Sequence, residues 1–503
     1  MKKQLKAISL LMAFVMVIGV VFSVACFADN EAAATITPDT SWYLEKSKTK
    51  TVTLRDAADL AGFSQLCNES TQYFYGWTIK LGKDIVYNEG NAADFATTAP
   101  ANVWKPIEDF WGTFDGQGYV ISGLYFKDPT AKNVGLFGCI NGATVKNVSV
   151  VNSYFSCARV VGSIAGEVMD LKATVSNCYS DAIIYANPDA IDGAMAGGIV
   201  GQIIGSPDGT LVENCWFAGS ILAETSKSDS QNASKCGGIV GWSHIGSGST
   251  TVKNCLVTGS VTAQTQASGI VGAARDGADS KAGNGTVLEN CLMLGTVGVT
   301  RISPTLFFGQ FSCVWKNGGR ITLNNVYGLD TFLANVSNLE FTGDKTTKVW
   351  NVGGTGVIVS DNSAKVSSES ITGDAANTTL VGFDFEGEDA IWETVAESTP
   401  VIKSLSFIAA NKASGLAEAP IDPTELEVEV EGGSGSGNNN ESKNDEKIHA
   451  ETDKATSDTV AESETEATLQ EEKSGCGSSV ACMSAVVLVC AGAAVISKKK
   501  KEN

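Results

Sequence analysis

The stretch that decides the fold is Gly197-Gly198-Ile199-Val200-Gly201, followed after a short interval by Val212-Glu213-Asn214-Cys215. The two blocks recur at Gly237-Gly238-Ile239-Val240-Gly241 with Val252-Lys253-Asn254-Cys255, and more loosely at Ser268-Gly269-Ile270-Val271-Gly272 with Leu288-Glu289-Asn290-Cys291. A chain that repeats one strand-and-turn unit at nearly constant spacing is built as a stack of units. We therefore expect function to lie on the sides or the tip of a rod rather than in a closed pocket.

The asparagine of the second block marks the period of the repeat. It stands at Asn147, Asn177, Asn214, Asn254, Asn290 and Asn325, so the successive spacings are 30, 37, 40, 36 and 35 residues. Short runs of β-branched and aromatic residues between Gly, Asn and Asp are typical of strands and tight turns. Each unit offers about three strands, as at 197–203, 211–217 and 220–223. The pattern predicts an all-β fold, a right-handed parallel β-helix with coils about 4.8 Å apart.

The recurrent residues have a physical reason in that geometry. Each Asn amide can bridge to the Asn of the coils above and below, and Gly can supply the positive φ that corners need. The cysteines that follow the asparagines should form an inward column of buried free thiols: Cys178, Cys215, Cys255 and Cys291. Disulfides along the column are an alternative. A metal site is a second one, although CxxC spacing and histidine partners are missing.

A short helix is expected ahead of the repeats. Thr53-Leu54-Arg55-Asp56 is similar to a capping box, and apolar residues follow at helical spacing, at Ala57, Leu60, Ala61 and Leu66. An uncovered first coil would expose both its core and its strand edge. We predict that this amphipathic helix covers the first coil.

Segments that follow this helix, and others near the end of the repeats, resemble a known family. The N-terminal motifs are Gly76-Trp77-Thr78-Ile79-Lys80-Leu81, then Trp104-Lys105-Pro106-Ile107, then the run GTFDGQGYVISGL from Gly112 to Leu124. This resembles the opening module of bacterial cell-surface β-helix proteins with GLUG-type repeats. The likeness covers most of residues 42–407. It includes two motifs that end the β-helix at its C-terminal side, Trp392-Glu393-Thr394 and Pro400-Val401-Ile402-Lys403. It implies the fold and an extracellular placement. It implies no activity, because the Gly, Asn and Cys of the motif are turn and core positions.

The N-terminal end has the layout of a secretory signal peptide, residues 1–28. Lys2, Lys3 and Lys6 precede the uncharged run 7–27, which closes on small residues before Asp29. A lipoprotein, in which Cys26 would be acylated, is the alternative interpretation.

The C-terminal end predicts a membrane anchor. Residues 478–497 are 20 uncharged residues followed by four lysines, and about 20 residues of helix cross a hydrocarbon core. The lysine tail, 498–503, belongs on the cytoplasmic side, so the bulk of the chain is expected outside. This end is similar to the anchors of surface proteins of Gram-positive anaerobes. The preceding segment, 422–475, has sixteen acidic residues against four lysines between Asp422 and Lys473, and is predicted to be a disordered spacer.

These features divide the chain into seven segments. They are a signal peptide at 1–28, an N-terminal cap with the first coils at 42–126, the repeats at 127–330, C-terminal coils and cap at 331–407, the acidic linker at 422–475, a transmembrane helix at 478–497 and a cytoplasmic tail at 498–503.

The sequence offers no catalytic, cofactor-binding or metal-ligating residues, and we expect no enzyme. His244, beside Trp242, is interpreted as a loop or surface residue, and Asp115 as part of a tight turn in FDGQG. The arginines are dispersed, and no pair of carboxylates aligns in successive coils, as glycoside hydrolysis would require.

Three functional hypotheses remain. The favoured one is a surface protein anchored in the plasma membrane, whose rod binds an extracellular glycan or protein, with contacts in the loops 224–235 and 276–285. The alternatives are a pectate-lyase-like enzyme with a divergent site and a passive envelope spacer. Nucleic acid is not an expected partner, since most of the net charge of −20 resides in the linker.

Overall fold

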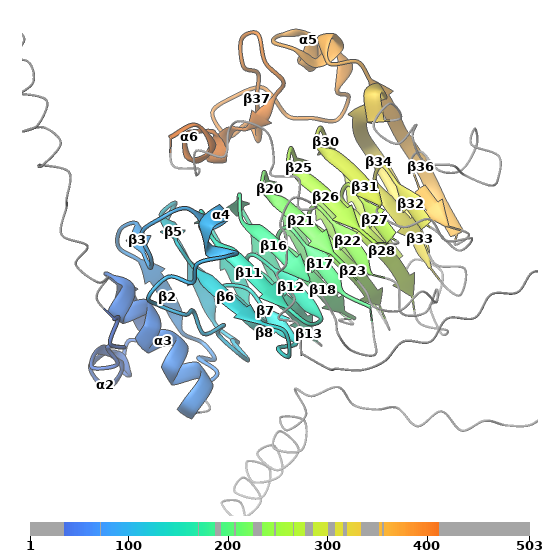
Figure 1. Cartoon of the computed structure of the whole chain (residues 1–503). Helices are drawn as coiled ribbons and strands as arrows, with labels where there is room; N and C mark the ends of the chain where they lie inside the picture. Colours follow the sequence, from blue (N-terminus) through green and yellow to red (C-terminus); the bar gives the residue numbers. More distant parts are fainter. Residues whose placement is uncertain are drawn as a thin grey trace, which may run out of the picture. The chain divides into compact units, whose positions relative to one another are not determined.

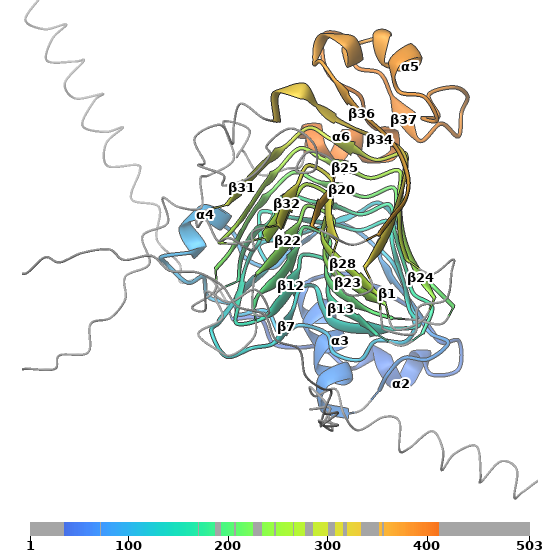
Figure 2. The same cartoon turned by 90° about the vertical axis from the view of Figure 1, so that its right-hand side faces the viewer.

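Parallel β-strands in stacked coils make up most of the protein. The computed structural model describes residues 35–70, 72–169, 171–186, 193–205, 208–224, 234–245, 248–264, 266–276, 285–299, 307–314, 319–332, 352–354 and 357–411. The strands form four parallel sheets in which each coil contributes its strands in the same order. Figure 1 shows the strands of successive coils side by side, and Figure 2 shows them superposed around a common interior. The predicted parallel β-solenoid is confirmed.

The first sheet has 17 strands. They are β1 (Thr51–Leu54), β2 (Thr78–Leu81), β3 (Ile85–Val86), β4 (Thr113–Asp115), β5 (Val120–Ser122), β9 (Thr144–Lys146), β10 (Ser149–Val151), β14 (Thr174–Ser176), β15 (Tyr179–Ser180), β19 (Thr210–Glu213), β20 (Trp216–Phe217), β24 (Ser249–Lys253), β25 (Leu256–Val257), β29 (Gly285–Glu289), β30 (Leu292–Met293), β34 (Arg320–Leu329) and β36 (Val357–Val366).

The other three parallel sheets have six, six and seven strands. The second sheet contains β6 (Tyr125–Asp128), β11 (Tyr154–Cys157), β16 (Ile183–Ala186), β21 (Ser220–Ala223), β26 (Ser260–Ala263) and β31 (Thr296–Val299). The third contains β7 (Asn133–Val134), β12 (Val160–Gly162), β17 (Met195–Gly197), β22 (Lys235–Gly237), β27 (Gln266–Ser268) and β32 (Phe307–Gly309). The fourth contains β8 (Phe137–Asn141), β13 (Ala165–Met169), β18 (Val200–Ile204), β23 (Val240–Ile245), β28 (Val271–Asp276), β33 (Ser312–Val314) and β35 (Val352–Gly354).

One coil contains five short strands rather than the expected three. The predicted strand 197–203 is divided between β17 and β18, with Gly198 and Ile199 at a corner between them. The predicted strand 211–217 is divided between β19 and β20 at Asn214 and Cys215. Only the strand at 220–223 matches the prediction, as β21. Each repeated motif thus spans a corner of the coil. A continuous run of apolar residues in the sequence does not show where such a corner falls.

The asparagine ladder is confirmed. All six asparagines have a positive φ, between 50° and 55°, a conformation that Asn tolerates better than most residues. The side-chain Nδ2 of each one donates to the Oδ1 of the previous one over 3.0 to 3.3 Å between Asn147 and Asn325. The ladder is longer than predicted, because Asn362 donates to Asn325 at 3.0 Å and Asn147 donates to Asp115 at 2.9 Å. Asn therefore serves twice, in the backbone turn and in the link between coils.

The expected role of the motif glycines is wrong. None of the glycines in the GGIVG blocks has a positive φ. Instead, the backbones of the third and fourth sheets lie so close together at this corner that no side chain fits between them. A Cβ on Gly201 would lie 2.7 Å from the carbonyl oxygens of both Gly166 and Val161, and one on Gly241 would lie 2.5 Å from the oxygen of Gly201. The glycines are required by space rather than by backbone conformation.

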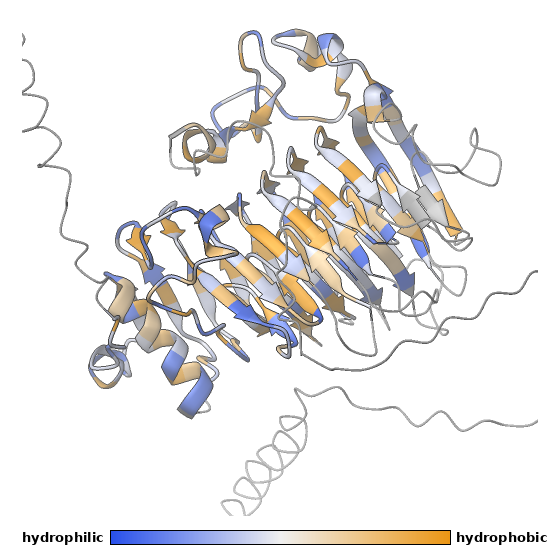
Figure 3. Cartoon of the chain, viewed as in Figure 1, coloured by the Kyte–Doolittle hydropathy of each residue, from blue (hydrophilic) through white to orange (hydrophobic). Residues whose placement is uncertain are grey.

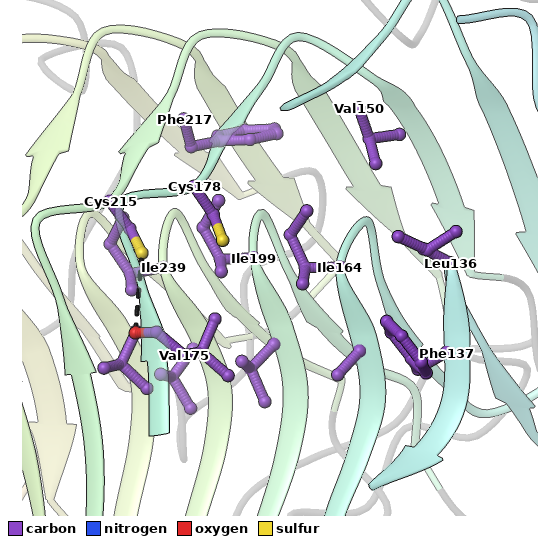
Figure 4. Packing of buried hydrophobic residues seen from close by; sticks show 14 of the residues in the cluster. Leu136, Phe137, Val150, Ile164, Val175, Cys178, Ile199, Cys215, Phe217 and Ile239 are labelled. Atoms are coloured by element: carbon purple, nitrogen blue, oxygen red, sulfur yellow. Dashed lines mark hydrogen bonds between the residues drawn. The ribbon is translucent and has the colours of Figure 1, made fainter. Parts of the chain in front are cut away.

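The interior of the coils is a continuous apolar core, and the four predicted cysteines are fully buried in it. Hydrophobic residues recur along neighbouring strands in Figure 3. Figure 4 shows Cys178 and Cys215 beside Ile199, Ile239 and Phe217, with the Sγ of Cys215 directed at the carbonyl oxygen of Val175, 3.8 Å away. The nine cysteines of the described residues are free thiols. The predicted inward column is confirmed.

The predicted N-terminal helix is present as α3 (Ala57–Ser70), but its cap is not the one expected. Thr53 belongs to β1, and the Oδ1 of Asp56 accepts from the backbone N–H of Asp59 at 3.0 Å. The Oδ2 of Asp59 accepts from the N–H of Arg55 at 2.8 Å, which completes a reciprocal pair. Phe63 of α3 packs on Phe114 and Phe137 of the first coils, with ring centroids 6.2 and 6.4 Å apart. The helix covers the core, as predicted. Two short helices accompany it, α2 (Trp42–Lys46) and α4 (Ala92–Phe95).

The C-terminal elements pack against the outward side of the first sheet. They are the 3₁₀-helix η2 (Glu369–Ile371), α5 (Ala375–Thr379), the antiparallel pair β37 (Trp392–Glu393) and β38 (Val401–Ile402), and α6 (Lys403–Asn411). Trp392, Ile402 and Leu405 form one cluster with a column of large residues at Tyr179, Trp216, Leu256, Leu292 and Tyr327. We call residues 369–411 the C-terminal cap.

Several predicted segments lie outside the described residues. They are the signal peptide, the acidic linker, the transmembrane helix and the lysine tail, together with most of the loops 224–235 and 276–285. In the part of the chain that is described, no helix has the length and apolarity needed to cross a bilayer.

Candidate binding cavity

A cavity of about 830 Å³ lies between the solenoid and the C-terminal cap. Strands β15 and β20 of the first sheet form one wall, and β37, β38 and α6 form the other. The lining residues are Tyr179, Asp181, Trp216, Ala218, Glu393, Thr394, Val395, Ala396, Val401, Ser406, Phe407, Ala409 and Ala410. Its volume falls within the range of roughly 300 to 1,000 Å³ that is usual for ligand sites.

Two aromatic residues from neighbouring coils make the solenoid wall. Tyr179 and Trp216 are register partners in β15 and β20, and their rings meet edge to face with centroids 5.5 Å apart. Each follows a core cysteine directly, so the strand alternation turns it to the outward side. The Nε1 of Trp216 donates to the Oγ1 of Thr258 at 2.8 Å. This bond fixes the indole, so the wall is formed before any ligand arrives.

In the cap wall, two neighbouring residues of a strand point to opposite sides. Trp392 and Glu393 are neighbours in β37, paired with Ile402 and Val401 of β38. Trp392 points into the apolar cluster and is buried, whereas Glu393 is exposed and lines the cavity. Beyond β38, α6 contributes Phe407, a residue that is 64% exposed. The cap thus adds one ring and one carboxylate to the aromatic wall.

Among the described lining residues, the charged side chains are Asp181 and Glu393. Asp181 lies directly after β15, and its Oδ1 accepts from the backbone N–H of Asn152 at 2.7 Å. Burial, and secondarily the charge of Asp181, raise the pKa of Tyr179 far above its usual value, so this phenol stays neutral. Lys, Arg and His do not occur among the described lining residues.

A second cavity of about 500 Å³ borders the other side of α6. Polar residues of the asparagine corner line it, together with apolar residues of the helix: Gln117, Gly118, Asn147, Ser149, Asn177, Ser404, Leu405, Phe407 and Ile408. Phe407 lines both cavities, so the position of α6 determines the width of each.

Sequence reasoning missed two carboxylates on either side of strand β8, Glu108 and Glu167. Ile107 and Phe110 bridge to Phe137 and Ile140 of β8, which aligns Glu108 with Gly138. Cys139 in turn pairs with Glu167 of β13, and the Oε2 of Glu167 accepts from the Nδ2 of Asn133 at 2.8 Å.

This arrangement changes the ionisation of Glu108. Burial, followed by the charges of Asp109 and Glu167, raises the pKa of Glu108 to about 7. The carboxyl is therefore partly protonated at neutral pH. Glu108 and Glu167 belong to coils on either side of β8, and each lies opposite a different residue of that strand, Gly138 and Cys139. Within the described ranges, no set of three His, Cys, Asp or Glu residues has a geometry suited to a metal ion.

His244, interpreted from the sequence as a loop or surface residue, lies near the end of a strand rather than in a loop. It belongs to β23, is half-buried, and stacks on Trp242 with ring centroids 4.8 Å apart and planes 2° apart. Arg275 of β28 is its register partner, and the Nζ of Lys235 lies 4.8 Å from the centre of the Trp242 ring. Burial, then the charges of Arg275 and Lys235, lower the pKa of His244. The imidazole is therefore held neutral in a basic, aromatic cluster.

Asp115 forms the predicted tight turn. Its Oδ1 accepts from the N–H of Gln117 at 3.0 Å, and Gln117 and Gly118 both have a positive φ. Burial raises the pKa of this carboxyl, but the hydrogen bonds from Asn147 and Gln117 outweigh it and leave the pKa below its usual value. These contacts are structural ones.

The chain has a distant structural likeness to solved proteins. No family model and no curated protein matches the chain. A crystal structure described as a "putative immunoglobulin A1 protease" from Bacteroides ovatus is similar over 70% of this chain and 92% of its own, with a TM-score of 0.47 and 17% sequence identity.

Proposed function

We propose that the protein is a surface protein anchored in the plasma membrane, with a right-handed β-helix outside the cell that binds an extracellular ligand, a glycan or a protein. The signal-like N-terminus, the acidic spacer and the apolar C-terminal segment with its lysines support this placement. The right hand is the one adopted by nearly all parallel strand connections. The resemblance to surface proteins with GLUG-type repeats agrees with it.

The observation that carries the binding function is the cavity under the C-terminal cap. Fixed aromatic rings and two carboxylates converge there in a space of ligand size. Apolar surface with a few oriented polar groups is the usual composition of a recognition site. The cavity also lies on the side of the coils rather than inside them, so a ligand can reach it without opening the core.

An array experiment tests this function. The full-length chain in mild detergent is applied to glycans and extracellular matrix proteins, beside two variants that differ only in where a bulky side chain is placed. Ala409→Trp fills the cavity, and Ala375→Trp adds the same side chain at an exposed position of α5. We expect a ligand that the protein and Ala375→Trp retain and Ala409→Trp loses. Absence of any ligand would favour a passive envelope spacer, and equal binding by both variants would place recognition elsewhere.

The carboxyl of Glu108 favours a second candidate, a pectate-lyase-like or hydrolytic enzyme acting on polysaccharides. Glycoside hydrolysis uses a carboxyl with a raised pKa as its general acid, and Glu108 has that property. Release of reducing sugars or unsaturated uronides from a polysaccharide panel tests it. Activity that disappears in Glu108→Gln would establish the enzyme, and its absence across the panel would exclude it for those substrates.

A further inference from the structure

The second cavity, of about 500 Å³ beside α6, has a buried hydroxyl in its lining that forms no hydrogen bond. Ser149 of β10 is 1% exposed, and its Oγ has no partner among the described residues. Buried polar groups in native proteins nearly always have a partner, so an exception beside a cavity indicates a group that is bound there. We propose that this cavity binds a neutral sugar. The inference goes beyond the proposed function, because it concerns a different cavity.

Ser149 makes room for a ligand at a position where the neighbouring coils have larger side chains. Its register partners are Val120 in β5 and Tyr179 in β15, and Tyr179 in turn pairs with Trp216. These three residues belong to the apolar cluster that includes the C-terminal cap. Because serine is smaller than any of them, the row of large side chains is interrupted at Ser149. The interruption leaves space next to α6 and places a hydroxyl there.

The asparagine corner supplies further donors and acceptors to the same cavity. Asn147 and Asn177 line it, and each uses one N–H and one oxygen lone pair in the ladder. A carboxamide has two of each, so both side chains keep one donor and one acceptor for another partner. A sugar hydroxyl both donates and accepts, and neighbouring hydroxyls of one ring can bond both groups of an amide. An anion only accepts and an ammonium group only donates, so neither matches this set.

The other walls also favour an uncharged ligand. The described lining residues carry no charge, and Leu405 and Ile408 of α6 are buried apolar residues. Moving a charged group into such surroundings costs far more free energy than moving a hydroxyl that finds hydrogen bonds. The C–H groups of a sugar ring suit the apolar side of the helix, while its hydroxyls meet the polar corner. Gln117 and Ser404 are exposed members of the lining, so a ligand can enter from the surface.

Sugars that differ in charge test the ligand class. Glucose, galactose and mannose are titrated into the full-length chain, each beside its uronate and its 2-amino sugar, in a detergent without a sugar headgroup. Binding is followed by saturation-transfer NMR. We expect at least one neutral sugar to bind, at least about tenfold more tightly than its two charged analogues. The methyl glycoside of that sugar distinguishes the end of a glycan, in which the anomeric oxygen is substituted, from a free sugar.

Two substitutions at Ser149 locate the sugar. Ser149→Ala removes the hydroxyl and should weaken binding at least about fivefold, while the free protein stays as stable as before, since no internal hydrogen bond is lost. Ser149→Leu fills the space with a side chain of the size found in neighbouring coils and should abolish binding. Ser260→Ala is the matched control, because Ser260 also has a buried Oγ without a partner and lies outside the cavity. Its affinity for the sugar should be unchanged, and thermal unfolding confirms that all three variants are folded.

The outcomes separate this inference from the proposed function. Binding of no neutral sugar, equal or tighter binding of the charged analogues, or full affinity in both Ser149 variants would overturn it. A sugar that both Ser149 variants retain and Ala409→Trp loses would lie in the first cavity, which supports the proposed function and contradicts this inference. If sugar binding depends on Ser149 and the array ligand is bound normally by Ala409→Trp, the second cavity is a sugar site and the first is not the recognition site.

Discussion

Asp115 and Asn147 begin the column of side chains that joins the coils. The Oδ1 of Asp115 accepts from the Nδ2 of Asn147 at 2.9 Å and at the same time from the N–H of Gln117 at 3.0 Å. A carboxylate only accepts hydrogen bonds, so it can start a ladder in which every amide donates in one direction. The polarity of the ladder is thus set at its first member and is maintained to Asn362.

The first prediction concerns the ladder itself. Asn254 donates to Asn214 and accepts from Asn290, and its φ is 50°. Asn254→Ala removes two side-chain hydrogen bonds. It also leaves an alanine in the left-handed region, where it lacks the polar side chain that lets Asn adopt this conformation. We expect the free energy of unfolding to fall by about 3 kcal/mol. The measurement is the change in urea midpoint.

The control for this prediction is Asn254→Gly at the same position. Glycine removes the amide but adopts positive φ without strain, so it should recover about 1 kcal/mol of the loss. If Ala and Gly were equally destabilising, backbone conformation would play no part at this corner. If both were neutral, the ladder would not contribute to stability.

Much of the scaffold was predictable because the same residue types, Asn and Cys, recur at equivalent positions of each repeat. The spacing of Asn and Cys predicts both the corner and the inward column, and the amphipathic spacing from Ala57 predicts α3. A residue that must adopt φ near 50° and also bridge neighbouring coils has few substitutes. Such positions are legible in one sequence, since the same constraint recurs in every coil.

The features that were missed depend on the register between coils. Glu108 and Glu167 come together only after the intervening loops are closed, and the repeat spacing varies from coil to coil. The lateral docking of the cap was equally hidden, although a signal for it exists. The residue after each core cysteine is large and apolar, at Tyr179, Trp216, Leu256 and Leu292. Such a row on an outward face requires a cover.

A second prediction follows from the close approach at the GGIVG corner. Gly201→Ala places a Cβ 2.7 Å from the carbonyl oxygens of Gly166 and Val161, and backbone cannot move aside as a side chain can. We expect a loss of about 3 kcal/mol or failure to fold, measured by soluble yield and thermal unfolding. Gly298→Ala is the control, because its Cβ would meet Thr262 at an ordinary 3.5 Å. Equal stability of the two variants would contradict the spatial role of Gly201.

A third prediction concerns the redox state of the cysteine column. Burial raises the pKa of Cys178, Cys215 and Cys255 well above the usual range, so they should not react with a thiol reagent in the folded protein. After unfolding without reductant, these three and Cys291 should all be labelled, as located by peptide mass spectrometry. Labelling of fewer than three of the four would show that the column contains disulfides.

The last prediction uses the carboxyl of Glu108 as a probe of its surroundings. Its pKa in the folded protein is about 7 against an ordinary 4.5, so the folded state holds a proton that the unfolded chain releases between these values. The contribution to stability is complete below pH 4.5 and is lost as pH rises through 7, with an upper limit of about 3 kcal/mol. Glu108→Gln keeps a neutral side chain at every pH, so its urea midpoint should change less between pH 5 and pH 8 than that of the unaltered protein. Glu386→Gln, at an exposed position, should leave the pH dependence as it was. If Glu108→Gln and the unaltered protein lost stability in parallel across this range, the carboxyl would be ionised at neutral pH and its burial would have no energetic consequence.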